Sequence, residues 1–155
     1  TRKGLAASPF DDEGVRVQRR AIVENGVLRG YVLGSYSARK LGLSTTGNAG
    51  GIHNISVTAN SEDLQSLIKQ MGTGLLVTEL MGQGVNTLTG DYSRGAAGFW
   101  VEHGEIQYAV DELTIAGNLA NMLPAIEAIG ADIDRRSHIN IGSMLIGKMT
   151  VAGND

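Results

Sequence analysis

Apolar positions along the chain fall mostly into short runs separated by glycine or polar turns, a pattern typical of short strands joined tightly. The runs at 15–24 and 27–33 flank Asn25-Gly26, a dipeptide favoured in two-residue hairpins because both residues tolerate positive φ. Residues 74–81 are apolar enough to predict a strand buried on both faces. Further strands are expected at 52–58, 85–89, 96–102, 105–110, 113–116, 139–146 and 149–152.

Helical spacing of apolar residues occurs in three places. Residues 36–41 predict a short helix ended by Gly42. Ser61 is expected to cap a second helix that reaches Met71, and Asn118 a third that reaches Ile129 with a kink at Pro124. The second helix is expected to dock through Leu64, Leu67, Ile68 and Met71. Because strands dominate and do not alternate strictly with helices, we predict an α+β fold: a strand-dominated sheet or barrel-like domain with tight hairpins and two or three helices.

Composition narrows the class of protein. A chain of 155 residues can bury its own core, so we expect residues 1–155 to form a single domain. Its 22 glycines and only two prolines favour tight turns. A net charge of −3 without a basic block argues against nucleic acid as a partner. No apolar run approaches the ~18 residues of a membrane span, and Thr1 opens no signal-peptide core, so we expect a cytoplasmic protein or a fragment of one.

The sequence predicts no metal site in this chain. It contains no cysteine, and its three histidines, His53, His103 and His138, form no closely spaced pair. Residues 142–148 match the phosphate-loop spacing G-x-x-x-x-G-K, but Met149 stands where a hydroxyl should reach magnesium. The residues between the two glycines are apolar and strand-like, so we reject a nucleotide site there.

Two polar segments each allow two interpretations, and the residues alone do not decide between them. The segment 44–51 is a polar, glycine-rich loop, and its residues 46–51 predict either a mobile surface loop or a nest of backbone amides that binds an anion. The acidic run 11–13 predicts a solvated turn or, alternatively, a base or ligand set.

Residues 90–95 miss the nucleophile-elbow pattern G-x-S-x-G because Asp91 stands at the first glycine position. A triad of Ser93 with a distant histidine and an acid stays a rival interpretation.

Several strings resemble the C-terminal region of the TldD/PmbA family, in the family's order and over essentially the whole chain. The strings are residues 8–14, 35–43, 46–54, 71–102, 104–110, 114–119 and 129–133. Residues 35–43 and 90–98 look like the PmbA (TldE) branch. The family chain is considerably longer, so the resemblance marks this sequence as its C-terminal part, with the N-terminal part absent.

The resemblance implies a cytoplasmic metallopeptidase in which a TldD-type subunit carries zinc and a PmbA-type subunit pairs with it. Such complexes cut unfolded or leader peptides, and members have also been described as modulators of DNA gyrase. The metal-bearing branch has a His-Glu-x-x-x-His motif upstream and a cysteine just before a late glycine. Here Ile141 precedes Gly142, and isoleucine cannot bind zinc. The resemblance therefore implies no catalytic residue, metal or other cofactor in this chain.

We therefore predict an accessory, non-metal subunit that pairs with a TldD-type partner and shapes the channel for an extended peptide substrate. The rivals are a pure assembly module and an independent hydrolase that uses Ser93 or the acidic run. The candidate channel or interface residues are Thr46, Gly47, Asn48, Gly50 and Gly51 in one loop, and Asp91, Tyr92, Ser93, Arg94 and Gly95 in a second segment expected to link two strands.

Overall fold

The protein is described by a computed structural model that covers residues 4–61 and 63–153. Its internal contacts group the chain into two compact units. Unit 1 consists of Thr1–Ser56 with Arg135–Asn140, and unit 2 of Val57–Asp134 with Ile141–Asp155. Each unit is described by itself below. The expectation of a single domain over residues 1–155 stays a prediction.

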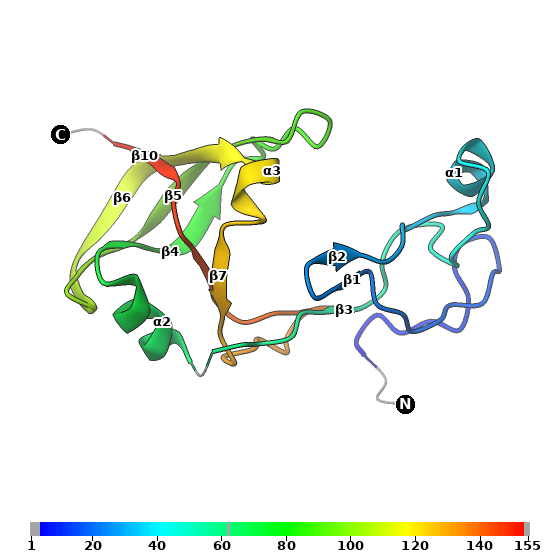
Figure 1. The fold of residues 1–155 in the computed structure, drawn as a ribbon, viewed down its shortest axis with the longest axis horizontal. Helices are drawn as coiled ribbons and strands as arrows, with labels where there is room; N and C mark the ends of the chain where they lie inside the picture. The colour runs from blue at the N-terminus through cyan, green and yellow to red at the C-terminus, as the bar shows by residue number, and fades with distance from the viewer. Residues whose placement is uncertain (1–3, 62, 154–155) are drawn as a thin grey trace. The chain divides into compact units, whose positions relative to one another are not determined.

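Unit 2 contains the main sheet, an antiparallel set of four strands in the order β10-β6-β5-β4 (Figure 1). The strands are β4 (Gly74–Met81), β5 (Asp91–Glu102), β6 (Glu105–Asn118) and β10 (Thr150–Ala152). The turn between β5 and β6 uses His103 and Gly104, whose φ angles of 53° and 75° are those expected of a tight hairpin. The sheet is open, with β4 and β10 at its edges, so the α+β class is confirmed and the described strands close no barrel.

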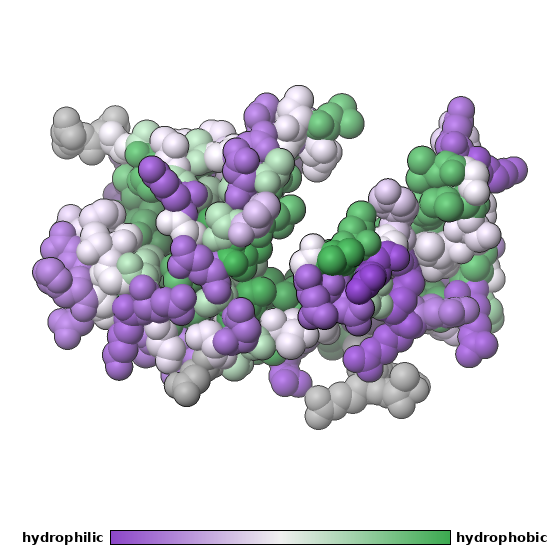
Figure 2. All heavy atoms as spheres, in the orientation of Figure 1, coloured by the Kyte–Doolittle hydropathy of each residue, from purple (hydrophilic) through white to green (hydrophobic). Residues whose placement is uncertain are grey.

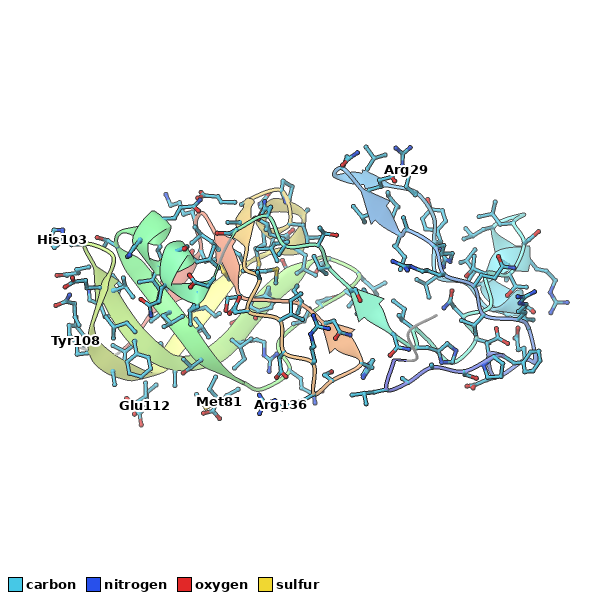
Figure 3. All side chains as sticks on the ribbon, turned by 90° about the horizontal axis from the view of Figure 1, so that it is seen from below. Arg29, Met81, His103, Tyr108, Glu112 and Arg136 are labelled. Atoms are coloured by element: carbon cyan, nitrogen blue, oxygen red, sulfur yellow. The ribbon has the colours of Figure 1, made fainter. Side chains whose placement is uncertain are left out.

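Helix α2 (Leu64–Met71) and a small two-stranded sheet form one buried cluster of unit 2. This sheet pairs β7 (Ile126–Ile129) with β9 (Met144–Ile146). Leu67 from α2, Ala128 from β7 and Leu145 from β9 form a buried cluster, against which Met71 packs. The predicted docking face of α2 is confirmed at Leu67 and Ile68, which are 4% and 2% exposed. In Figure 3, Met81 and Glu112 point away from the side of the main sheet on which α2 lies.

Two predicted helix ends in unit 2 are wrong for local reasons. Asp63, not Ser61, caps α2, because its carboxylate accepts the N–H of Ser66 at 2.9 Å. Helix α3 (Leu119–Met122) begins after Asn118 as predicted but ends before Pro124, which has no N–H to continue it. The residues expected to extend α3 form β7 instead, where β-branched isoleucines suit a strand.

Four strand predictions also need correction. Residues 85–89 form a turn with a single bridge, Val85 to Tyr92, and no strand. Strand β4 is half-buried over its first four residues and exposed over the rest, so it is not covered on both faces. The segments 105–110 and 113–116 are one bulged strand, β6, in which Glu112 adopts a φ of 52°. The expected strand over 139–146 is divided between β8 (Ile139–Asn140) of unit 1 and β9 of unit 2.

Unit 1 is mostly irregular backbone with short elements. They are β1 (Val23–Glu24), β2 (Val27–Leu28), α1 (Ser35–Lys40), β3 (Ile55–Ser56) and β8 (Ile139–Asn140), of which β3 and β8 pair in parallel. The Asn25-Gly26 hairpin is confirmed, with φ of 52° and 75°. The strands predicted at 15–24, 27–33 and 52–58 are much shorter in the structure. Exposed apolar side chains show as green surface in Figure 2, and in unit 1 they include Val23, Val27 and Leu28 of the hairpin.

Candidate functional site

The loop 46–51 belongs to unit 1 and is held by hydrogen bonds to other segments of that unit. Thr46 and Leu33 are joined twice, since the Thr46 N–H donates to the Leu33 carbonyl at 3.0 Å and the Leu33 N–H donates to Thr46 Oγ1 at 2.8 Å. The amide oxygen of Asn48 accepts from the Arg20 guanidinium at 2.8 Å, and its Nδ2 donates to the Gly51 carbonyl at 3.2 Å. These bonds favour an ordered loop over a mobile one.

Asp11 is the main support of this loop. Its side chain is buried, with 6% of the residue exposed. Oδ1 accepts the N–H groups of Val15 at 2.8 Å and Glu13 at 3.0 Å, and Oδ2 accepts that of Ala49 at 3.0 Å. Burial raises the pKa of this carboxyl, but the three N–H groups and the nearby charge of His53 hold it below the ordinary value of 3.8. The acidic run therefore forms a turn, but the prediction of a solvated turn is wrong at Asp11, which is buried, while Asp12 and Glu13 are exposed.

Two glycines allow the loop to lie against the segment that holds it. A Cβ on Gly47 would lie 2.6 Å from the carbonyl oxygen of Arg16, and one on Gly50 would overlap the carboxylate of Asp12. Both glycines also adopt positive φ, 68° and 85°, which disfavours any other residue. Gly47 and Gly50 thus serve close packing.

Four of the six backbone amides of the loop are already engaged, so no two successive ones are left for an anion nest. The N–H groups of Thr46, Gly47 and Gly51 donate to Leu33 O, Thr45 Oγ1 and Asn48 O respectively. The Ala49 N–H donates to Asp11. An anion nest requires successive free N–H groups. Any ligand of this loop would therefore meet its side chains and carbonyl groups.

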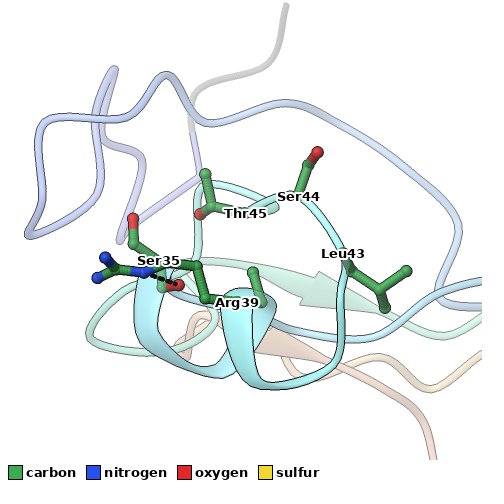
Figure 4. A pocket seen from close by; sticks show the side chains of 6 residues that line it. Ser35, Arg39, Leu43, Ser44 and Thr45 are labelled. Carbon is green, nitrogen blue, oxygen red and sulfur yellow. Dashed lines mark hydrogen bonds between the residues drawn. The ribbon is translucent and has the colours of Figure 1, made fainter.

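A shallow hollow lies between α1 and the residues that lead into the loop (Figure 4). Its lining is Ser35, Ala38, Arg39, Leu43, Ser44 and Thr45. Arg39 is the cation among these residues, and its Nε donates to the Ser35 carbonyl at 3.4 Å. The hollow is open and carries both polar and apolar groups, which suits an extended chain more than a small molecule.

The second predicted segment, Asp91 to Gly95, is part of strand β5 and does not form a loop. It pairs on one side with β6, where Ser93 lies opposite Ala116 and Arg94 opposite Ile115. On the other side, Gly95 lies opposite Met81 of β4. The earlier prediction of a connection between strands is wrong because the connecting turn lies upstream, within residues 82–90.

Asp91 and Arg94 bind different partners and not each other. Asp91 accepts the hydroxyl of Thr89 at 2.6 Å and the amide of Asn118 at 3.2 Å, and these bonds lower its pKa below 3.8. The Arg94 guanidinium donates to the carbonyl of Leu80 at 3.3 Å and to that of Met81 at 3.5 Å. Both side chains therefore hold the two ends of the turn that precedes them.

Ser93 is badly placed for a triad within its own unit. His103 is the histidine of unit 2, and it lies in the turn at the far end of β5. Nine strand residues lie between the two positions, which is about 30 Å of extended chain. Ser93 instead donates its backbone N–H to Gly84 at 2.7 Å.

Within residues 4–61 and 63–153, no three histidine, aspartate or glutamate side chains converge as metal ligands would. No helix in that part of the chain is long and apolar enough to cross a bilayer. Residues 142–148 contribute strand β9, and a Cβ on Gly142 would overlap the carbonyl of Gly130. The rejected phosphate-loop match is thus a strand packed against a neighbouring backbone.

The turn at 82–90 is the feature that sequence reasoning missed, because its valine and leucine were assigned to a strand. Asn86 organises it: Oδ1 accepts the N–H groups of Leu88 at 2.9 Å and Thr89 at 3.3 Å. The Asn86 N–H donates to the Asp91 carbonyl at 2.8 Å. An asparagine followed by threonines and Gly90 is a turn signal that could have been used.

Comparison with known proteins relates this chain to a family of metallopeptidases. Residues 1–153 match the family described as the PmbA/TldA metallopeptidase C-terminal domain. The chain is 60% identical over 151 residues to metalloprotease PmbA of Escherichia coli O157:H7, covering 97% of this chain and 34% of that protein. It thus spans about a third of the length of the curated relatives it matches.

Two solved structures share the fold. One, from Bacteroides thetaiotaomicron and described as a modulator of DNA gyrase, matches with a TM-score of 0.90 at 32% identity, over 98% of this chain and 34% of that one. The other is TldE from Thermococcus kodakarensis, with a TM-score of 0.80 at 25% identity, over 94% of this chain and 36% of that one.

Proposed function

Since the chain belongs to the PmbA/TldD family of metallopeptidases, we propose that it is part of the accessory, non-metal subunit of a cytoplasmic TldD/PmbA-type complex. The complex cleaves unfolded or leader peptides, with zinc held by the TldD-type subunit. This chain pairs with that subunit and helps to shape the path of an extended peptide.

The observation that carries this proposal is the 60% identity to a PmbA protein over 97% of the chain. It supports the PmbA branch in particular, together with the structural likeness to TldE. The pair Ile141-Gly142 supports the same branch, because the resemblance puts a cysteine ligand before the glycine in metal-bearing chains and isoleucine offers no ligand atom.

The open edge of the main sheet supports an extended peptide as the substrate. Strand β4 ends the sheet, and its outer edge pairs with no other strand in the part of the chain described here. An extended peptide can add to such an edge through main-chain hydrogen bonds, which read little sequence. Loose specificity of this kind suits unfolded or leader peptides.

Fewer observations support the two alternative functions, an assembly module and an independent hydrolase. A pure assembly module would use the same edges and loops without touching the peptide, and the description of relatives as modulators of DNA gyrase is compatible with it. An independent hydrolase based on Ser93 has no histidine near it within unit 2. The acidic run serves the loop 46–51 through Asp11.

The test combines the full-length chain containing this segment with the metal-bearing subunit of the same organism and an unfolded peptide. We expect cleavage only when both subunits are present, and loss of cleavage when zinc is removed. Cleavage by this subunit alone would favour the hydrolase. A stable complex whose cleavage rate equals that of the metal-bearing subunit alone would favour the assembly module.

A further inference from the structure

The turn of the hairpin formed by β1 and β2 places an asparagine directly before a glycine (Figure 1). Asn25 is the only asparagine in the sequence that a glycine follows. Both residues are exposed, and a Cβ built on Gly26 would meet no other atom within 4 Å. The side-chain carbonyl of an asparagine can be attacked by the backbone nitrogen of the next residue, and glycine hinders this approach least because it has no Cβ. The turn therefore holds side by side the two groups that take part in deamidation.

The hydrogen bonding of Asn25 differs from that of asparagines in other turns. Within residues 4–61 and 63–153, the structure records no hydrogen bond for the Asn25 side chain and none for the Gly26 N–H. By contrast, the side-chain oxygens of Asn48 and Asn86 accept hydrogen bonds at 2.8 Å and 2.9 Å. Rotation of these two side chains is restrained, whereas that of Asn25 is not.

The hairpin that carries Asn25 is short and weakly supported. It consists of two cross-strand pairs, Val23 with Leu28 and Glu24 with Val27, and in the described residues it pairs with no further strand. Its three apolar side chains are 51–58% exposed, so they bury little surface. The ion pair between Glu24 and Arg29, at 3.2 Å, joins two exposed side chains and contributes little (Arg29 is labelled in Figure 3). A two-stranded hairpin of this kind is marginally stable, so it opens often.

Opening matters because the closed turn does not have the reactive geometry. Asn25 and Gly26 have φ angles of 52° and 75°, as in a type I′ turn. The mirror-image relation to a type I turn puts ψ of the first central residue near about +30°. Rotation about this bond is needed to bring the Gly26 nitrogen onto the face of the Asn25 carbonyl. The rate of reaction is therefore set by how often the hairpin opens.

We propose that Asn25 is a modification site that deamidates spontaneously in the folded protein. Water or hydroxide removes the proton of the Gly26 N–H, and the nitrogen forms a bond to Cγ of Asn25. The bond from Cγ to Nδ2 breaks, and Nδ2 leaves as ammonia with a proton returned by water. The resulting succinimide is opened by one water molecule at either carbonyl, which gives aspartate or isoaspartate. No oxidant, reductant or enzyme is needed, and the proposal does not depend on the function proposed above.

The product should not close the same hairpin. Isoaspartate routes the main chain through Cβ and Cγ, which adds one atom between positions 25 and 26. A two-residue turn has no room for that atom without a change in strand register. Either product also adds one negative charge to a chain of net charge −3, next to Glu24. Deamidation should therefore break the hydrogen bond from the Arg29 N–H to the Ile22 carbonyl, at 2.8 Å, that continues the hairpin.

The first test follows conversion in the full-length protein that contains this segment, incubated at mildly alkaline pH and digested for mass spectrometry. An isoaspartyl methyltransferase serves as the reagent that detects isoaspartate. We expect Asn25 to convert at least about tenfold faster than Asn48 and Asn86 in the same digest, and no more than about thirtyfold slower than in a synthetic peptide of residues 21–30. Conversion of Asn25 no faster than that of Asn48 and Asn86, or stronger protection relative to the peptide, would overturn the proposal.

The second test separates the chemistry from the stability of the turn. Gly26→Ala strains the turn and favours opening, yet its Cβ obstructs the attacking nitrogen, so we expect conversion at least about tenfold slower. Gly14→Ala is the matched control, because Gly14 lies in the same unit with a φ of 74° and equally open surroundings, and it should leave the rate at Asn25 unchanged. Arg29→Ala should raise the rate. Equal rates in wild type and Gly26→Ala would show that Gly26 is not the nucleophile and would overturn the proposal.

Discussion

The Oδ2 atom of Asp11 accepts the backbone N–H of Ala49 at 3.0 Å, across 38 residues of sequence. The same carboxylate binds the N–H groups of Glu13 and Val15, so one side chain closes its own turn and holds the loop 46–51. Two segments that the sequence marked separately, one acidic and one rich in glycine, are thus parts of a single structure.

Asp11→Asn should loosen the loop while leaving unit 2 unchanged. The amide replaces one acceptor oxygen with a donor, which faces an N–H group that needs an acceptor. We expect the Ala49 N–H to exchange with solvent at least about tenfold faster, with no change for amides of β5. Asp12→Asn is the control, because no N–H donates to the side chain of Asp12 among the bonds that the structure records. Equal exchange at Ala49 in wild type and Asp11→Asn would show that Asp11 does not hold the loop.

The loop should also respond to acid in a defined direction. The pKa of Asp11 in the folded chain lies below its ordinary value of 3.8, so its contribution to stability is present above that value. That contribution is lost as the pH falls through the folded pKa. We expect the NMR shift of the Ala49 amide to titrate with a midpoint below 3.8 and the titration to vanish in Asp11→Asn. A midpoint at or above 3.8 would contradict the hydrogen-bonding account.

Leu67→Ala should destabilise unit 2. Leu67 is 4% exposed and contacts Ala128 and Leu145 in the core cluster, so truncation leaves a cavity. We expect a loss of about 2–5 kcal/mol in the free energy of unfolding by denaturant, and less than about 0.5 kcal/mol for the exposed Gln70→Ala on the same helix. A similar small loss for both variants would mean that this face of α2 is not part of the core.

Arg94 should matter more to association than to stability. Its guanidinium spans two carbonyls at the end of β4, a geometry that the single ammonium of lysine copies poorly. We expect Arg94→Ala to reduce complex formation or peptide turnover at least about tenfold with little change in melting temperature, and Arg94→Lys to restore it only in part. Full activity and association of Arg94→Ala would show that the turn keeps its shape without this residue.

The purified chain should bind no stoichiometric zinc. The reasons lie in the sequence: no cysteine, three scattered histidines, and Ile141 before Gly142. Elemental analysis after exposure to zinc and desalting measures this directly. About one zinc per chain, lost together with an activity, would contradict both the expectation and the proposed division of roles.

The sequence predicted the elements whose signals are local. Asn25-Gly26 adopts positive φ and forms the predicted hairpin, and Gly42, with a φ of 67°, follows α1 as predicted. Asn118 caps a helix for the same kind of reason, through a side-chain bond to the Ala120 N–H. Each of these signals acts within a few residues, so no tertiary information was needed.

The elements that were mispredicted depend on distant pairing. Ile126 and Ile129 fit a helical face as well as a strand. They form a strand because this segment pairs with β9. Residues 91–95 contain turn-forming types, yet they lie in β5 because β6 pairs with them throughout. The support of the loop 46–51 by Asp11 was equally invisible, since a carboxylate 38 residues away carries no local signal.

The discontinuity of unit 1 has a consequence for biosynthesis. Its strand β3 pairs in parallel with β8, which is separated from it by the whole first part of unit 2. A ribosome that adds roughly 5–20 residues per second would therefore expose an unpaired β3 for several seconds before residues 139–140 emerge. During that interval the local hairpins of unit 2 can already form, whereas unit 1 must wait for its last strand. Unit 1 would therefore stay open to chaperone binding for longer than unit 2, although most of unit 1 is synthesised earlier. A chain terminated before residue 139 would lack the strand that pairs with β3.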